Sequence, residues 1–134
     1  MANTVILIPY KRKGNHLQLL LKSEFVPGWD AHPDLCGLLY TDAEGPLESA
    51  IIKSFKKESG ILIEGNELIR LGVCALKRNS DHMLDLYAVD LSKRTEPVFD
   101  AEAKLIWAAE EQVVESIDAH LLAAYARLKF LLFS

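Results

Sequence analysis

The sequence contains little cysteine and no long apolar run. Its two cysteines, Cys36 and Cys74, lie far apart and form no CxxC pair. This spacing supplies neither a disulfide framework nor the ligand pairs of a structural zinc site, so we expect free thiols in a reducing compartment. The N-terminal segment MANTVILIPYKRKG reaches Lys11 after an apolar stretch that is too short to span a membrane, and it lacks the basic start of a signal peptide. We therefore expect a soluble, cytoplasmic protein that does not bind membranes.

Positive charge is not in excess either. The 134 residues contain 15 lysines and arginines against 19 aspartates and glutamates, which gives a formal net charge of -4. This balance argues against a broad basic surface for the backbone of a nucleic-acid polymer, and we expect no such partner. A small anionic ligand is compatible with the composition, because one pocket can be positive on an acidic protein.

No internal repeat, low-complexity segment or linker divides the chain, and its length suits one domain over residues 1–134. The segment Thr4–Tyr10 is apolar on both faces, which predicts a buried central strand. His16–Ser23 is predicted as its hairpin partner after a turn at KRKGN. Two segments rich in turn-forming residues, Ser23–Gly37 and Tyr40–Pro46, are predicted as loops.

The second half of the chain predicts two strands joined by a turn, a last strand and a C-terminal helix. The two strands lie within residues 67–78 and 81–92, the last strand is Ala103–Ala109, and an acidic helical start follows at Glu110–Glu115. The final helix carries an apolar stripe at three- and four-residue spacing, made of Leu121, Tyr125, Leu128 and Leu132. This order predicts an α/β fold in which helices cover both faces of a mixed sheet.

The segment LESAIIKSFKKES (Leu47–Ser59) is predicted as an amphipathic helix, with Pro46 in its first turn and Gly60 as its stop. At about 100° per residue, Glu58 falls on the apolar side of this helix together with Phe55. A carboxylate without a partner is costly there. The alternatives are an ion pair with a helix lysine (Lys53 or Lys57), a cap onto loop N–H groups, or a bound metal ion.

This helix resembles the Nudix box, which has the form G-x5-E-x7-R-E-U-x-E-E-x-G-U, where U is a bulky aliphatic residue. Aligned on Gly60 and Ile61, the box positions R, E, U, E and E fall on Lys53, Ser54, Phe55, Lys57 and Glu58. The first glycine and glutamate of the box fall on Leu39 and Gly45, with Gly37 and Glu44 nearby. The opening strand, the LLLKS segment, Trp29 and the late LIWAAEE segment also resemble the family, so the similarity covers nearly the whole chain.

The resemblance implies an α/β/α sandwich with a mixed central sheet. It also implies a hydrolase of phosphoanhydride bonds in nucleoside-diphosphate-linked substrates that uses Mg²⁺ or Mn²⁺. The expected metal ligands are Glu58, Glu48 and Glu44, and the expected catalytic residues are Glu58 and Glu102. Three residues are candidates for substrate binding: Trp29 by stacking, and Lys53 and Lys57 by neutralising phosphate. Trp107 is predicted either to frame the pocket or to pack in a strand.

Ser54 and Lys57 depart from the box, because a neutral hydroxyl and a cation stand where the family has carboxylates. We therefore expect metal-dependent hydrolysis to be weakened or lost, with a metal bound only if the protein is active. The alternative is a non-catalytic module that binds a nucleotide-like ligand or a partner protein. The apolar C-terminal segment KFLLFS is a candidate homodimer contact.

Overall fold

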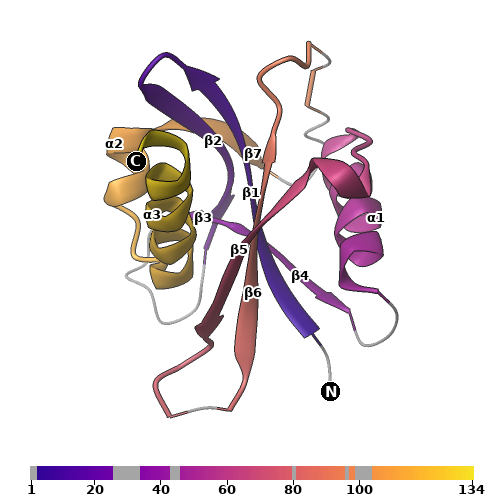
Figure 1. The fold of residues 1–134 in the computed structure, drawn as a ribbon, viewed down its shortest axis with the longest axis vertical. Helices are drawn as coiled ribbons and strands as arrows, with labels where there is room; N and C mark the ends of the chain where they lie inside the picture. Colours follow the sequence, from indigo (N-terminus) through magenta and orange to yellow (C-terminus); the bar gives the residue numbers. More distant parts are fainter. Residues whose placement is uncertain (1–2, 26–33, 43–45, 80, 96, 99–103) are drawn as a thin grey trace.

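The computed structural model describes residues 3–25, 34–42, 46–79, 81–95, 97–98 and 104–134 (Figure 1). Its centre is a seven-stranded mixed sheet. The central strand β1 (Asn3–Lys13) pairs in parallel with β6 (Met83–Asp90). On its other side it pairs antiparallel with β2 (His16–Glu24) and with β4 (Leu38–Asp42). The predicted central strand and its hairpin partner are confirmed, but β1 continues through Lys13, so the turn predicted at KRKGN is limited to Gly14 and Asn15.

The remaining strands complete the two sides of the sheet. Strands β3 (Asp34–Cys36) and β7 (Leu105–Ala109) pair with β2, and β5 (Leu68–Ala75) pairs with β6. The loops predicted over Ser23–Gly37 and Tyr40–Pro46 are therefore wrong where β3 and β4 replace them. These strands are short, and their extended conformation comes from pairing with distant segments rather than from a local pattern.

Gly37 lies between β3, which pairs with β2, and β4, which pairs with β1. A Cβ atom at this position would lie 2.8 Å from Cγ2 of Ile6, so glycine permits the close approach to β1. Its N–H donates to Oδ2 of Asp118 at 3.2 Å. Asp118 is also the N-cap of helix α3 (Ala119–Phe133), and it therefore ties this helix to the sheet.

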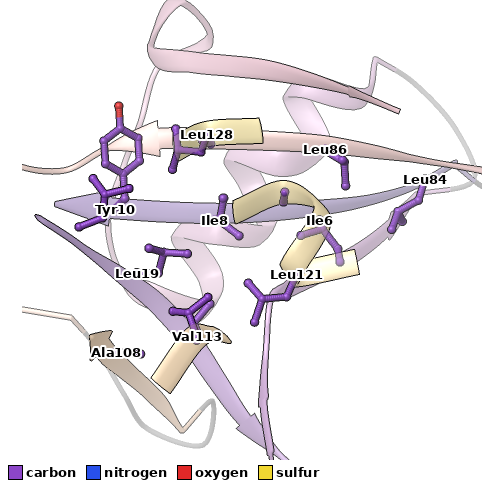
Figure 2. Close-up of a cluster of buried hydrophobic side chains, with 14 residues drawn as sticks. Ile6, Ile8, Tyr10, Leu19, Leu84, Leu86, Ala108, Val113, Leu121 and Leu128 are labelled. Carbon is purple, nitrogen blue, oxygen red and sulfur yellow. The ribbon is translucent and has the colours of Figure 1, made fainter. Parts of the chain in front are cut away.

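Alternation along β1 directs its side chains into two cores, one on each face of the sheet. Val5 and Leu7 pack toward helix α1 (Leu47–Ser59), whereas Ile6 and Ile8 pack toward α3. Figure 2 shows the core on the α3 side, where buried residues include Tyr10, Leu19, Leu86, Leu121 and Leu128. Helices therefore cover both faces of the sheet (Figure 1), which confirms the predicted α/β/α sandwich.

Helix α1 ends where the sequence predicts. Gly60 adopts a φ of 80°, and its N–H donates to the carbonyl of Lys56 at 2.8 Å. Pro46 lies just before the helix as its N-cap rather than in the first turn. Phe55 is fully buried against the sheet, and burial of such a side chain contributes about 2–3 kcal/mol. The short 3-10 helix η1 (Gly65–Glu67) then leads into β5.

The predicted acidic helical start forms a short separate helix, α2 (Glu110–Val114), before α3. In the predicted stripe of α3, Leu121 and Leu128 are fully buried, while Tyr125 and Leu132 are half-buried. The stripe therefore faces the sheet as expected. Among the described residues, no helix has the length and apolar character that crossing a membrane requires.

The last turns of α3 leave two large apolar side chains in solvent. Phe130 is 74% exposed and Leu131 is 55% exposed. Exposed apolar side chains at one end of a helix are compatible with a contact between copies of the chain. The homodimer contact stays a prediction.

Strand β5 lies at the edge of the sheet and carries a bulge between Arg70 and Gly72. Gly72 has a φ of 103°, and a Cβ atom there would lie 2.9 Å from Nη1 of Arg127. From α3, Arg127 donates through this Nη1 to the carbonyls of Leu71 at 3.2 Å and Val73 at 2.8 Å. The guanidinium of Arg127 therefore binds two carbonyl oxygens at this edge that would otherwise be open to hydrogen bonds from another strand.

Candidate functional site

Glu58 is the acid of the Nudix box that this sequence retains at positions 54, 57 and 58. It lies near the end of α1 and faces the sheet. Its Oε1 accepts a hydrogen bond from the hydroxyl of Tyr40 on β4 at 3.0 Å. Its Oε2 lies 3.5 Å from Nζ of Lys22 on β2. The side chain of Glu58 is 19% exposed and that of Lys22 is 32% exposed. We call Glu58, Lys22 and Tyr40 the Glu58 site.

Tyr40 donates a hydrogen bond to the carboxylate of Glu58. Burial, followed by the charge and the hydrogen bond of Glu58, raises the pKa of Tyr40 far above its ordinary value of 10.0. The phenol therefore stays protonated at physiological pH and donates to Glu58. Lys22 supplies the balancing positive charge. The carboxylate thus has one neutral partner and one cationic partner.

Glu58 pairs with Lys22 rather than with Lys53 or Lys57, the cations that the helix pattern offered. Lys53 and Lys57 are both exposed on α1. Lys22 lies two residues after Leu20, which is buried in the core under α1, so alternation along β2 directs both side chains to this face. The period of two along β2 was the signal that could have placed Lys22 on the same face as Leu20.

The two box positions without acids lie close to Glu58 in the sequence of α1. Ser54 is half-buried one helical turn earlier, and Lys57 is the preceding residue. Lys53 lies one turn before Lys57. The carboxylate of Glu58 and the four ammonium groups of Lys22, Lys53, Lys56 and Lys57 give a formal charge of -1 + 4 = +3 at this end of the helix. The helix edge is therefore positive.

Glu48, an expected metal ligand, lies in the first turn of α1. It precedes Glu58 by ten residues, which is about 15 Å along the helix axis at 1.5 Å per residue. At its own end of the helix, its charge adds to burial in raising the pKa of Tyr87. The structure therefore does not bring Glu48 and Glu58 together. The other expected site residues, Trp29, Glu44 and Glu102, lie outside the described residues.

The donor set at the Glu58 site does not fit the Mg²⁺ or Mn²⁺ that the resemblance implies. Such ions prefer several oxygen ligands, with carboxylates among them. In the part of the chain that the structure describes, no group of three or more His, Cys, Asp and Glu residues could hold a metal ion. Both oxygens of Glu58 already face donors, and one of these is the ammonium of Lys22. A divalent cation would have to displace that ammonium and approach a positive helix edge.

Trp107 extends the same face of the sheet along β7. It pairs with Leu20 of β2 and is half-buried against the core under α1. Nζ of Lys11 lies 4.5 Å from the centroid of its ring. A cation–π contact of this kind contributes about 0.5–1 kcal/mol where it is exposed. Of the two roles that the sequence left open, the structure shows packing, with one ring face in contact with Lys11.

No sequence model of a protein family matches the chain, and no curated protein sequence matches it. Solved structures are similar to it. The Nudix domain of Shewanella oneidensis NrtR, in complex with ADP ribose, aligns at 14% identity and a TM-score of 0.64, over 93% of this chain and 86% of that one. The Ap4A hydrolase of C. elegans aligns at 14% identity and a TM-score of 0.62, over 98% of each chain.

A MutT/nudix family protein from Enterococcus faecalis aligns at 14% identity and a TM-score of 0.61, over 81% of this chain. The alignment covers 43% of the Enterococcus protein, so this chain spans less than half the length of that relative. Identities at this level establish a shared fold and leave activity to the site itself. The protein has the Nudix fold.

Proposed function

We propose that this chain binds a phosphate-bearing, nucleotide-like ligand and that metal-dependent hydrolysis is weakened or lost in it. The observation that supports this proposal is the pairing of Glu58 with Lys22 at 3.5 Å and with Tyr40 at 3.0 Å. The ammonium of Lys22 and the hydroxyl of Tyr40 therefore lie against the carboxylate that would otherwise hold a metal ion.

The positive helix edge favours direct contact with phosphate. An ammonium and a phosphate oxygen about 4 Å apart attract by about 4 kcal/mol at an effective dielectric constant of 20, before desolvation is subtracted. Lys57 and Lys53 are exposed one turn apart on α1, on a side of the helix next to that of Glu58, and their ammonium groups are open to such a group. Lysine binds phosphate as a point charge without a metal ion. Trp29 is a further proposed ligand contact through stacking on a base.

Proteins of similar structure are described with different ligands. The Shewanella domain is in complex with ADP ribose, longer NrtR is in complex with a 27mer DNA, and T. brucei MERS1 is in complex with RNA. The net charge of -4 favours a small ligand over a polymer for this chain. We therefore place the ligand in the class of nucleoside diphosphates linked to another group.

A weakened hydrolase is the second candidate function. The side chain of Glu58 is 19% exposed, so it can reach a bound ligand. Glu44 and Glu102 are also present in the sequence as further proposed acids. This function predicts slow, metal-dependent cleavage of a phosphoanhydride bond that stops in Glu58→Gln.

The direct test is calorimetric titration of ADP-ribose and ATP, first in EDTA and then in Mg²⁺ or Mn²⁺. We expect binding in EDTA. Lys57→Ala should weaken it by about three- to tenfold, because one phosphate contact is removed. Lys56→Ala is the matched control, since Lys56 is an exposed lysine of the same helix on another side. Failure of both nucleotides to bind under every condition would contradict the proposal.

Turnover of the same nucleotides separates the two functions. Metal-dependent cleavage that vanishes in Glu58→Gln would establish the hydrolase and contradict a complete loss of activity. The double variant Ser54→Glu, Lys57→Glu changes the local charge by -3 and places two carboxylates beside Glu58. We expect this variant to gain Mn²⁺ binding, measured by electron paramagnetic resonance, while the unaltered protein shows none at the same concentration. No gain of binding would contradict the box alignment.

A further inference from the structure

A pocket of ≈ 460 Å³ lies at the end of the β1–β2 hairpin. Its lining residues are Lys11, Arg12, Lys13, His16, Leu17, Gln18 and Ser92. Among the lining residues that the structure describes, three are basic and none is acidic, and the guanidinium of one of them, Arg12, lies over the ring of Phe133. The volume lies in the range of pockets that hold small ligands. We call this site the hairpin pocket.

The register of the hairpin gathers polar side chains on one face. Lys11 lies opposite Gln18, and Lys13 lies opposite His16. Residues that face each other in an antiparallel pair project to the same side of the sheet. Ser92, which follows the end of β6, adds a hydroxyl group. The hairpin pocket thus combines two ammonium groups, an imidazole, an amide and a hydroxyl.

Two carboxylates near the hairpin pocket, within the described part of the chain, already have hydrogen-bond donors. Asp90 accepts from the N–H of Ser92 at 2.8 Å. Glu110 accepts from Nζ of Lys129 at 2.6 Å, and its other oxygen lies 3.7 Å from Nδ1 of His16. Lys129 balances the charge of Glu110, and the lysines of the described lining leave the hairpin pocket positive on a chain of net charge -4.

The hairpin pocket and the Glu58 site share one face of the sheet. Gln18 and Lys22 project to the same side of β2 and are four residues apart, which corresponds to about 13 Å. Leu20 lies between them, paired with Trp107, and Lys11 contacts the ring of that tryptophan. Two positive regions therefore lie at either end of one strand segment, with an aromatic residue beside it.

We infer that the hairpin pocket is a phosphate-binding site, and that it takes a second phosphate group of the ligand proposed above. This inference rests on the proposed function for the first phosphate, which lies near Glu58. The ligand class is then a nucleotide with a phosphate on the ribose 2′ or 3′ oxygen in addition to its 5′ phosphate chain. Lys13, His16 and Ser92 are the residues that would contact the added group.

Inorganic pyrophosphate tests phosphate binding at the hairpin pocket without a nucleoside, because the amide shifts report on each site separately. In an NMR titration of the ¹⁵N-labelled chain, we expect saturable shifts of the amides of Lys13, His16 and Ser92. Lys13→Gln should weaken the apparent affinity at these amides by about three- to tenfold. Lys77→Gln is the charge-matched control on the β5–β6 turn and should leave the affinity unchanged. Absence of shifts at the hairpin, or an affinity that Lys13→Gln does not alter, would overturn the site.

ADP-ribose and ADP-ribose 2′-phosphate differ by one phosphate. Comparing their affinities tests whether the hairpin pocket takes a second phosphate group of the nucleotide. We expect the 2′-phosphate to bind about fivefold tighter, and Lys13→Gln to remove this preference without changing the affinity for ADP-ribose. Equal affinities in the unaltered chain would overturn the assignment of ligand class. If pyrophosphate shifts the hairpin amides but neither nucleotide binds, the hairpin pocket stands and the proposed function fails. Tighter binding of a single-stranded oligonucleotide, lost in Lys13→Gln, would assign the hairpin pocket to a polymer and overturn the inference.

Discussion

Removing the charge of Lys22 tests the pairing on which the proposed function depends. At 3.5 Å, an ammonium and a carboxylate attract by about 5 kcal/mol at an effective dielectric constant of 20. Desolvation and the exposure of the two side chains, 32% for Lys22 and 19% for Glu58, offset most of this attraction. Partly exposed pairs contribute about 0.5–1 kcal/mol net. We therefore expect a coupling energy near the upper end of that range between Lys22→Met and Glu58→Gln.

The assay is urea unfolding followed by circular dichroism for the unaltered chain, the two single variants and the double variant. Lys22→Met keeps the apolar stem, and Glu58→Gln keeps an acceptor for Tyr40, so the cycle isolates the charge pair. The ion pair Arg70–Asp85, at 3.3 Å but with Arg70 56% exposed, is the matched control and should couple less. A coupling below about 0.3 kcal/mol, or one no larger than the control, would refute the pairing.

Two further predictions concern the scaffold. Gly72→Ala should lower the free energy of unfolding by about 1–3 kcal/mol in urea, because the φ of 103° suits glycine and the new Cβ would meet Arg127. Gly14→Ala, at a φ of 58° with open space around it, is the control and should cost less. The second prediction concerns Glu110: burial alone would raise its pKa, but hydrogen bonds led by that from Lys129 outweigh burial and lower the pKa below 4.5. A lowered pKa stabilises the fold above the ordinary pKa, and this contribution is lost as the pH falls through the lowered value. The stability advantage of the unaltered chain over Glu110→Gln should thus be constant above about pH 5.5 and shrink below pH 4.5, and an advantage independent of pH would contradict the contact.

The parts of the fold that local sequence encodes were predictable. The segment Thr4–Tyr10 carries apolar side chains on both faces of the strand, because a helical layer covers each face of the sheet. Pro46 and Gly60 bound helix α1 through their own backbone preferences. Strands β3 and β4 were missed because three to five residues carry too little pattern, and because their extended form depends on pairing with β2 and β1.

The site was predictable only in part. Glu58 stood out because the helix wheel and the box alignment both select it. Its partners Lys22 and Tyr40 lie 36 and 18 residues away in the sequence, and no local periodicity connects them with α1. Alternation along β2 identifies the face on which Lys22 lies, but not which helix covers that face. The composition of KRKGN indicates only a turn, whereas pairing with β2 makes its lysines part of a pocket.

Arg127 follows Val73, whose carbonyl it binds, by 54 residues in the chain. During synthesis, β5 can pair with β6 before the segment that forms α3 has left the ribosome. In that interval the carbonyls of Leu71 and Val73 have no guanidinium beside them, and the sheet edge is open to a second nascent chain. The folded protein is therefore protected, and aggregation should begin from chains in which α3 has not yet docked or has detached.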